Sequence, residues 1–480
     1  MCGIIGVYMH PNASELALAG LAELGHRGQG SRGIGVAKAT GDTYIRMERE
    51  GQLPLAHPFT LMKLEGDIAV AQERYPTSGS SDQDVDSQPA YADSFQGRIV
   101  VVENGDTPTL EKFRAPFRHL HAHTEAEAIA RFLAREIDGG AIMTVAIQKF
   151  QQTYDGAFSL IVLFQHRLYL ACDRHKFRPL WYGRGTHENG RAWYAAASEN
   201  DALLSIECEP IREVEAGEIV ILGAEGAVSA GITGEIVRAH CLFELVYFLG
   251  VASDAFGIPA EEFRYRLGVR VGERLRPVFT REDKLQLDVV CSVPDSSNPF
   301  SEGLATGIGV PLSFGLMRKH RRRTFTLPGG RHRAVASKFR PSHFRLIGKR
   351  ALFGEDSIVR GTTIRKLVGM IRADGRPAEL HLAVSCAPIL GNCFYGIDMK
   401  EPSKLIAPGF TDAGVVDTEA LAKSVGLDSV TYATIEDMAA VLESFGANPD
   451  DFCTACWTEK YPTEGGRHLA EKIARRIASR

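Results

Sequence analysis

The stretch that decides the fold of the second half of the chain is Glu355-Asp356-Ser357-Ile358-Val359-Arg360-Gly361-Thr362-Thr363. It follows an apolar run at 350–353, which we predict to be a β-strand. After it, apolar side chains recur at the spacing of one helix face, at Ile364, Leu367, Val368 and Ile371. Another strand is predicted at 379–385. Strand, acidic turn, helix and strand in this order are typical of a parallel α/β sheet.

The acidic turn carries groups that suit a phosphorylated sugar. Gly361, Thr362 and Thr363 stand where a loop enters a helix N-terminus, so N–H groups, hydroxyls and the positive dipole end can hold a phosphate. Glu355 and Asp356 would face ribose hydroxyls, directly or through a divalent ion. An ordinary strand-to-helix turn is the alternative. A nucleotide-binding P-loop is disfavoured, because no G-x-x-x-x-G-K-[ST] motif occurs here.

The segment Asp356–Thr363 resembles the 5-phosphoribosyl-1-pyrophosphate (PRPP) signature of type I phosphoribosyltransferases, and D-S-I-V-R-G-T-T matches the amidotransferase version letter for letter. Glu355 replaces the first Asp that the amidotransferases carry there. The resemblance implies binding of PRPP, and the residues it assigns to this role are Lys338, Glu355, Asp356, Ser357, Arg360, Gly361, Thr362 and Thr363.

Two further segments support a phosphoribosyl site. The loop Val293–Ser297 resembles the family's pyrophosphate loop, which would place Ser296 beside Mg²⁺ with Glu355 and Asp356; in isolation it would be a plain Pro-Asp-Ser turn. The basic segment 318–338 resembles the loop that closes over PRPP, in which Lys338 would meet the pyrophosphate and exclude water. A solvated surface and nucleic-acid binding are the other interpretations of its arginines.

The first 235 residues have a different pattern, with short β-type runs separated by Gly, Asp and Asn turns. We predict strands at 3–8, 98–102, 159–164 and 218–222. Helices are predicted at 14–24, with Ser14 as a possible cap, and at 124–134. These elements predict a layered, mainly antiparallel α/β domain.

Cys2 follows the initiator Met directly. Removal of Met1 would leave a thiol and an α-amino group on one residue, and an α-amine titrates near pH ~8, so it can act as base for its own nucleophile. By itself, Cys2 could equally be a small buried residue that starts a strand. The segments that follow it in the sequence favour the catalytic interpretation.

Five motifs occur in the order and approximate spacing of class II glutamine amidotransferases, which are N-terminal-nucleophile hydrolases: Cys2–Gly6, His26–Gln29, Arg74–Thr77, Asn104-Gly105 and Thr124–Glu127. The resemblance implies that the thiolate of Cys2 attacks the side-chain amide of glutamine. Arg74 would hold the α-carboxylate and Glu125 the α-ammonium. Asn104 and the N–H of Gly105 would donate to the oxyanion. The other interpretations are a surface salt bridge for Arg74 and a hairpin turn for Asn104-Gly105.

Several positions depart from the amidotransferase pattern. Glu125 replaces the usual Asp, Gln72-Glu73 replaces His and a β-branched residue, Glu103 replaces His, and Gly30 replaces Glu. These changes leave two other functions open. One is a PRPP-binding regulatory or assembly protein, and the other is an ammonia-dependent phosphoribosyltransferase that keeps only the second chemistry.

Nine cysteines in 480 residues are too few for a secreted disulfide scaffold. Cys453 and Cys456 form a C-x-x-C pair, which suggests a metal clip or a redox motif. With Cys241 and Cys393 they resemble the [4Fe–4S] ligand segments of one branch of amidophosphoribosyltransferases. Four thiolates can hold either zinc or an iron–sulfur cluster, and the resemblance implies the cluster. Core packing is predicted for Cys172, Cys208, Cys291 and Cys386.

The composition excludes some classes of function. With 44% hydrophobic and 24% charged residues and a net charge of −4, the chain is not expected to capture nucleic acid or acidic membranes electrostatically. No run approaches the roughly 20 apolar residues of a membrane span and no signal peptide is evident, so we expect a cytoplasmic protein. Residues 467–480 predict a basic amphipathic helix packed through Leu469, Ile473 and Ile477; a membrane or partner helix is the alternative.

The resemblances together cover the chain from Cys2 to Pro462. They imply an α/β protein with an N-terminal-nucleophile hydrolase αββα sandwich at 2–235, a type I phosphoribosyltransferase parallel-sheet domain at 245–445 and a tail at 446–480. The implied reaction transfers ammonia from glutamine to PRPP, giving 5-phosphoribosylamine, glutamate and pyrophosphate, as in the first step of purine biosynthesis. Mg²⁺ and a [4Fe–4S] cluster are the implied cofactors. The implied partners are glutamine, PRPP, inhibitory purine nucleotides and further copies of the chain in a homotetramer.

Overall fold

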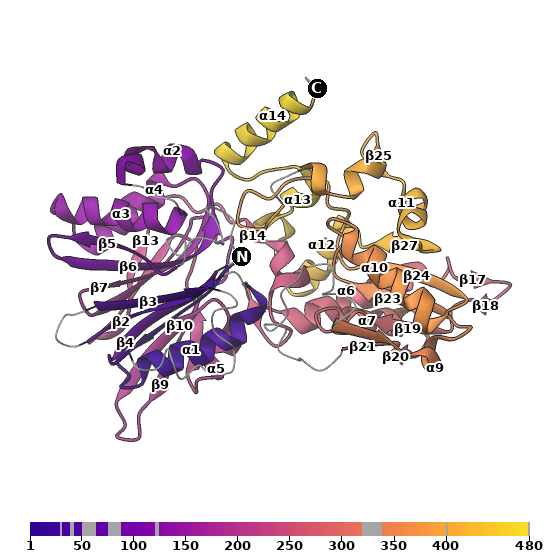
Figure 1. Cartoon of the computed structure of the whole chain (residues 1–480), viewed down its shortest axis with the longest axis horizontal. Helices are drawn as coiled ribbons and strands as arrows, with labels where there is room; N and C mark the ends of the chain where they lie inside the picture. Colours follow the sequence, from indigo (N-terminus) through magenta and orange to yellow (C-terminus); the bar gives the residue numbers. More distant parts are fainter. Residues whose placement is uncertain are drawn as a thin grey trace.

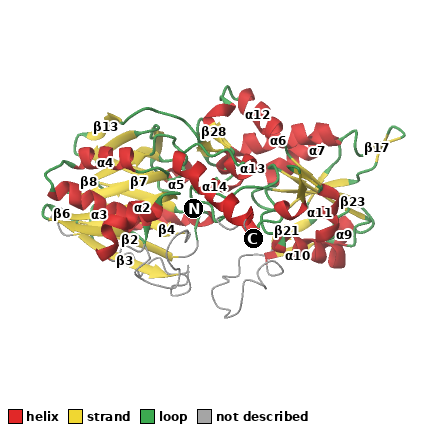
Figure 2. Ribbon diagram, turned by 90° about the horizontal axis from the view of Figure 1, so that it is seen from above, coloured by secondary structure: helices red, strands yellow, loops and turns green. Residues whose placement is uncertain are grey.

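The computed structural model describes residues 1–28, 31–38, 43–49, 64–74, 88–120, 124–318, 338–399 and 402–478. Figure 1 shows two lobes side by side along the long axis, with the first half of the chain in one and the second half in the other. The N-terminus lies between the lobes, and it keeps this central position when the molecule is seen from above in Figure 2. Cys2 is therefore carried at the junction of the lobes.

The N-terminal lobe contains two packed sheets. The first has seven strands in the order β11-β9-β10-β1-β4-β2-β3, and every neighbouring pair in it is antiparallel. Its strands are β1 (Gly3–Tyr8), β2 (Ser31–Ala37), β3 (Thr43–Arg49), β4 (Ile68–Arg74), β9 (Trp181–Thr186), β10 (Ala192–Ala197) and β11 (Glu209–Glu213).

The second sheet has six strands in the order β13-β12-β8-β7-β6-β5, again antiparallel throughout. Its strands are β5 (Ala90–Ser94), β6 (Gly97–Asp106), β7 (Ala157–Phe164), β8 (Arg167–Cys172), β12 (Glu218–Gly223) and β13 (Gly226–Ile232). The helices of this lobe are α1 (Ala13–Glu23), α2 (Leu110–Arg114), α3 (Glu125–Asp138), α4 (Met143–Thr153) and α5 (Asn200–Leu204).

Side chains that alternate along β1 show how the layers form. Ile4 and Tyr8 pack between the sheets, in one cluster with strand residues of the second sheet. Ile5 and Val7 point the other way, into the cluster that contains the buried side of α1. On the far side, α3 and α4 cover the second sheet. Because strand side chains alternate between faces, a helix layer is needed outside each sheet. The predicted αββα sandwich is confirmed.

The possible cap at Ser14 and the alternative interpretation of Asn104-Gly105 as a hairpin turn are both wrong. Helix α1 begins at Ala13 after Asn12, and Ser14 is buried in its first turn, so Ser14 is not the cap. Asn104 and Gly105 lie inside β6, paired with β7, and not in a hairpin turn. By contrast, Thr124 does cap α3, because its hydroxyl accepts the N–H of Glu127 at 3.3 Å.

The C-terminal lobe is built on the predicted parallel sheet. Five strands lie in the order β20-β19-β23-β24-β27, and all four pairings are parallel. They are β19 (Val289–Ser292), β20 (Leu312–Ser313), β23 (Arg350–Glu355), β24 (Glu379–Val384) and β27 (Ser429–Tyr432). The helices are α6 (Ala260–Leu275), α7 (Asn298–Ile308), α9 (His343–Leu346), α10 (Thr362–Met370), α11 (Thr418–Val425) and α12 (Ile435–Ser444).

Helices α6 and α7 touch through glycines. A methyl group on Gly268 of α6 would lie 2.1 Å from the carbonyl oxygen of Phe300, and one on Gly307 of α7 would lie 2.2 Å from that of Val269. A methyl group on Gly303 would lie 2.1 Å from the carbonyl oxygen of Tyr265, and one on Gly272 would lie 2.7 Å from that of Leu304. The two helix backbones are therefore in direct contact at these glycines.

Short elements join the lobes. Strand β14 (His240–Cys241) pairs in parallel with β28 (Phe452–Cys453), and a π-helical turn, η5 (Glu244–Phe248), follows β14. The remaining two-stranded pairs are β15 (Asp254–Ala255) with β16 (Ile258–Pro259), β17 (Thr280–Arg281) with β18 (Lys284–Leu285), β21 (Leu316–Arg318) with β22 (Phe339–Pro341), and β25 (Thr411–Asp412) with β26 (Val415–Val416).

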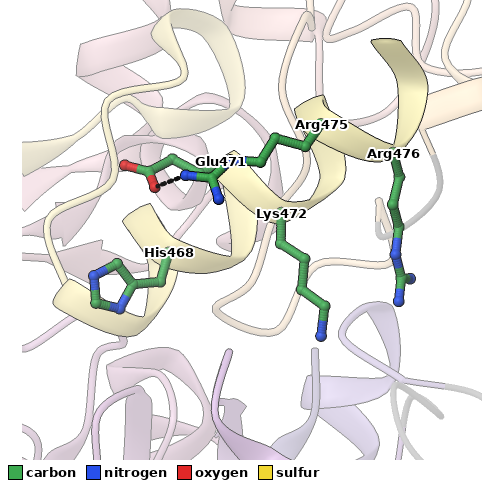
Figure 3. A pocket seen from close by; sticks show the side chains of 5 residues that line it. All are labelled: His468, Glu471, Lys472, Arg475 and Arg476. Carbon is green, nitrogen blue, oxygen red and sulfur yellow. Dashed lines mark hydrogen bonds and ion pairs between the residues drawn. The ribbon is translucent and has the colours of Figure 1, made fainter. Parts of the chain in front are cut away.

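The tail ends in α13 (Ala455–Thr458) and α14 (Glu464–Ala478). Leu469 and Ile473 of α14 pack against the core of the C-terminal lobe, as predicted for a packed terminal helix, and the side chain of Ile477 lies outside the described part. Its charged side is exposed, and Figure 3 shows Lys472 and Arg476 extending from it while Arg475 pairs with Glu471. Among the described residues, no helix combines the length and apolar character needed to cross a membrane.

Candidate active sites

Cys2 lies immediately before β1 and is buried, at 8% exposure. Its backbone N–H donates to Oδ1 of Asn104 at 3.0 Å. In the ladder between β1 and β4, Gly3 lies opposite Glu73, so the antiparallel register continues with Arg74 opposite Cys2. Three residues from distant segments, which the sequence assigned to one centre, are thus brought together.

The two predicted oxyanion donors are available. Within the described part of the chain, Nδ2 of Asn104 has no hydrogen-bond partner although the residue is fully buried. Gly105 lies opposite Phe158, whose N–H and C=O bond to Asp173 at 2.9 and 3.1 Å. Gly105 therefore directs its own N–H away from β7. A buried amide without a partner is costly in free energy, which is expected where a substrate oxygen supplies the partner.

The unusual residues around this centre have structural roles. Nε2 of Gln72 donates to the carbonyl of Glu103 at 2.7 Å, and the N–H of Glu103 donates to Oε1 of Gln72 at 2.9 Å. This reciprocal pair ties β4 of one sheet to β6 of the other, next to Asn104. Glu73 forms an ion pair with Arg32 at 2.9 Å, so its charge is compensated.

Arg74 and Glu125 are both buried, at 3% and 2% exposure. The surface salt bridge considered for Arg74 is therefore wrong. Glu125 is the first residue of α3, where the positive end of the helix dipole favours a carboxylate. Gln29, Gly30 and residues 75–77 of the predicted motifs lie outside the described residues.

An array of buried charges lies behind the nucleophile. Arg27 donates through Nε to the carbonyl of Cys2 at 3.3 Å, through Nη1 to Glu199 at 2.5 Å, and through Nη2 to Glu244 at 2.8 Å. Oε1 of Glu244 also accepts Nη1 of Arg178 at 3.1 Å. Burial acts to raise the pKa of Glu199, but His26 and Arg27 outweigh it and hold that pKa well below its usual range. Sequence reasoning missed this array.

The second centre is a cavity of about 720 Å³ at the carboxyl end of the parallel strands. The N-terminal lobe contributes Met1, His26 and Arg27 to its wall. All the predicted PRPP and Mg²⁺ residues except Lys338 line it: Ser296, Glu355, Asp356, Ser357, Arg360, Gly361, Thr362 and Thr363. Met1, which directly precedes the nucleophile, and the PRPP turn thus line the same cavity.

Asp356, which is buried, and Glu355, which is partly buried, form an acid pair in this cavity. Burial raises the pKa of Asp356 to about 6, and burial together with the charge of Asp356 raises the pKa of Glu355 well above its usual range. Ser296 donates its hydroxyl to Asp356 at 2.5 Å. Among the described residues, Oε2 of Glu355 and Oδ1 of Asp356 have no hydrogen-bond partner. Paired carboxylate oxygens of this kind fit a divalent cation such as Mg²⁺.

The turn after β23 has the geometry of an anion site. Gly361 has φ +70° and caps α10, and a side chain there would strike Ile406, since a Cβ would lie 2.4 Å from its Cδ1. Arg360 pairs with Asp398 at 2.8 Å. Lys338 is exposed and is absent from the described cavity wall, and residues 319–337 of the predicted closing loop lie outside the described part.

The four cysteines of the predicted cluster come together from three segments. Cys241 lies opposite Cys453 in the β14–β28 pair, and the pKa of Cys456 is raised by burial and by the charges of Cys241, Cys393 and Cys453. None of the four forms a disulfide bond. In the described ranges, no group of three or more His, Cys, Asp or Glu side chains stands at the spacing of one bound metal ion. Cys172, Cys208, Cys291 and Cys386 are buried in the core, as predicted.

Known proteins resemble the chain over its whole length. Amidophosphoribosyltransferase of Methanothermobacter thermautotrophicus is 33% identical over 491 residues, covering 100% of this chain and 98% of the relative. The chain belongs to the amidophosphoribosyltransferase family. The amidophosphoribosyltransferase of Methanocaldococcus jannaschii is 32% identical, covering 97% of this chain and 98% of the relative. No protein-family model matches the chain.

Solved structures agree with membership of the amidophosphoribosyltransferase family. Glutamine PRPP amidotransferase from B. subtilis, complexed with ADP and GMP, has a TM-score of 0.81 and 28% identity, covering 96% of this chain and 98% of that chain. A structure described as the allosteric regulatory enzyme of purine biosynthesis has a TM-score of 0.83 and 27% identity, with 96% of each chain covered. The likeness confirms the fold in both lobes.

Proposed function

We propose that this amidophosphoribosyltransferase makes 5-phosphoribosylamine from glutamine and PRPP, using Cys2 in one centre and the acidic turn in the other. The family shows that the chain is a glutamine-dependent PRPP amidotransferase of purine biosynthesis. The residue assignments are ours, and the single observation that carries them is the cavity shared by Met1, Arg27 and the PRPP turn.

In the glutaminase centre, loss of Met1 frees the α-amine of Cys2. The site lowers the pKa of the buried α-amine of Met1 to about 6, chiefly by burial. The α-amine that loss of Met1 would leave on Cys2 can accept the thiol proton of the same residue. The thiolate then attacks the glutamine amide carbon, while Asn104 and the N–H of Gly105 stabilise the oxyanion. Collapse releases ammonia, and water hydrolyses the thioester to glutamate.

Arg74 and Glu125 fix the substrate through its two charges. The guanidinium pairs with the α-carboxylate and the carboxylate with the α-ammonium, so the side-chain amide is the part that reaches Cys2. Because Glu73 is paired with Arg32, its carboxylate is not an uncompensated charge beside Arg74. This favours a working glutaminase over an ammonia-only enzyme.

Ammonia then enters the shared cavity without meeting bulk water, which would protonate it. In the second centre, Ser357, Arg360 and the Gly361–Thr363 turn hold the phosphoryl groups of PRPP, and Glu355 and Asp356 face the ribose. Ammonia displaces pyrophosphate from the sugar carbon. Mg²⁺, held by Ser296, Glu355 and Asp356, would neutralise the departing pyrophosphate.

The other partners are part of the same proposal. Cys241, Cys393, Cys453 and Cys456 would hold a [4Fe–4S] cluster that acts structurally, because it would join three distant segments. The B. subtilis protein was solved with ADP and GMP, and purine nucleotides are accordingly proposed as inhibitory ligands here. A homotetramer is proposed as the assembly.

One assay tests the proposed reaction. Formation of 5-phosphoribosylamine is measured with glutamine and, separately, with ammonium salts, in the presence of PRPP and Mg²⁺. Product with both sources supports the proposal. Product with ammonium alone would indicate a silent glutaminase centre, and product with neither would leave a PRPP-binding regulatory protein.

A further inference from the structure

The segment Cys393–Asp398 of the C-terminal lobe touches both active centres. Its Tyr395 carbonyl accepts Nη2 of Arg178 at 2.6 Å, and its Asp398 pairs with Arg360 of the PRPP turn at 2.8 Å. Between these two contacts, Gly396 lies against Gly105 of the glutaminase centre. The segment is therefore held at points on either side of its contact with the oxyanion strand.

The contact between Gly396 and Gly105 is backbone against backbone. Gly396 has φ +108°, and a methyl group there would lie 3.1 Å from the carbonyl oxygen of Gly105 and 3.2 Å from its carbonyl carbon. Gly105 is also hemmed in by Ala157, since a Cβ on Gly105 would fall 1.8 Å from the carbonyl oxygen of Ala157. Gly105 is thus enclosed by its own lobe and by Gly396. A methyl group on Gly396 would press on the peptide group that joins Gly105 to Asp106, and the displacement would pass through the Cα of Gly105 to its own N–H, which belongs to the preceding peptide group.

The same segment is tied to the nucleophile. Arg178, fully buried, donates to Tyr395 and to Oε1 of Glu244, and that oxygen also accepts Arg27, which bonds the Cys2 carbonyl. Ion pairs this deeply buried are rigid, because breaking one leaves an uncompensated charge. Cys2 and the support behind Gly105 therefore have a common anchor.

We propose that Gly396 is a positioning residue for the glutaminase centre, holding the Gly105 N–H at the distance from Cys2 that the oxyanion requires. This inference rests on the proposed function, because the oxyanion exists only if glutamine is hydrolysed at Cys2. It means that a residue of the C-terminal lobe positions one of the oxyanion donors of the N-terminal lobe.

The test compares Gly396→Ala with Gly231→Ala. Gly231 is exposed on β13 and has a similar φ of +101°, but a methyl group there would meet nothing within 4 Å. Both variants carry the same kind of backbone strain, and only one presses on Gly105. We expect G396A to lower glutamine-dependent kcat roughly 10- to 100-fold, because oxyanion donors lose effect when displaced. The KM for glutamine, ammonia-dependent turnover and alkylation of Cys2 by iodoacetamide should stay within about twofold of the wild type.

Each outcome is decisive. Equal glutamine-dependent kcat in G396A and G231A overturns the inference, as does an equal fall in glutamine- and ammonia-dependent rates. If G396A is insoluble, Asp398→Asn is used instead, because it releases the half-exposed end of the segment. Basal glutamine hydrolysis, measured without PRPP, must then fall in this variant. An unchanged rate of hydrolysis overturns the inference. If the wild-type protein has no glutamine-dependent turnover, the proposed function itself is wrong. If the wild type is active and only the comparison of variants fails, the inference about Gly396 is wrong and the proposed function stands.

Discussion

Replacing Asp356 by Asn should stabilise the protein while destroying its reaction with PRPP. The pKa of this buried carboxyl is raised from 3.8 to about 6, first by burial. The folded state therefore holds the proton more tightly than the unfolded state, and stability declines as pH rises through this range. The pKa of the carboxyl differs by about two units between the folded and unfolded states, at about 1.4 kcal/mol per unit. At pH 8 the ionised carboxylate therefore lowers the free energy of unfolding by about 3 kcal/mol. At pH 5 the destabilisation is about half as large, because the carboxyl in the folded state is then mostly protonated.

The asparagine removes the charge and keeps the shape, and its oxygen can still accept the Ser296 hydroxyl. In urea unfolding without Mg²⁺, we expect Asp356→Asn to raise the free energy of unfolding by about 3 kcal/mol at pH 8 and by about half as much at pH 5. Turnover with glutamine and with ammonia should fall together, while basal glutamine hydrolysis persists. Added Mg²⁺ should stabilise the wild type and have little effect on the variant.

The matched control is Asp283→Asn in the exposed β17–β18 turn, where φ of +57° suits Asn as well as Asp. Its free energy of unfolding should change by less than about 0.5 kcal/mol at either pH. If Asp356→Asn is no more stable than the wild type at pH 8, or if its advantage does not depend on pH, the carboxylate is not strained by burial. If PRPP turnover survives, residues 355–363 are not the phosphoribosyl site.

Three further results are expected. Cys2→Ala should abolish glutamine-dependent turnover and spare ammonia-dependent turnover, and equal loss of both would show that the thiol is structural. Glu125→Gln should raise the KM for glutamine roughly tenfold without affecting the ammonia reaction, because it removes the partner of the α-ammonium; an unchanged KM contradicts this role. Protein purified without oxygen should be brown with about four iron and four sulfide per chain, and Cys393→Ser or Cys456→Ser should lose both colour and stability. Colourless protein with one zinc would replace the cofactor.

Residues that act within one short stretch were found from the sequence. The turn at 355–363 carries its acids, glycine and threonines in nine consecutive positions, and periodicity alone placed a helix after it. The motif around Asn104 was also found, although the hairpin that Asn-Gly usually indicates is not formed. The local preference of Asn-Gly for a turn is overridden there by the pairing of β6 with β7. Such a disagreement between local preference and structure is expected at a functional site.

Contacts between distant residues could not be found in this way. Arg27 and Glu244 are 217 positions apart, and a charged residue that is destined for burial looks like any exposed one in the sequence. Gln72 and Glu103 were seen only as departures from a motif, because their bonds depend on the packing of two sheets. Gly396 carries no signal beyond being glycine. Its importance comes from a backbone in the other lobe.

The glycine contact between α6 and α7 limits how the C-terminal lobe can respond to its substrate. Helix packing through side chains can slide by changing rotamers, but at their glycine contacts α6 and α7 have no side chain to rearrange. The two helices must therefore move together as one rigid body. Arg264 of α6 is bonded to the carbonyls of Leu245, Leu249 and Ser296. A displacement of the loop that carries Ser296 would therefore be transmitted through Arg264 to Leu245, which is the neighbour of Glu244.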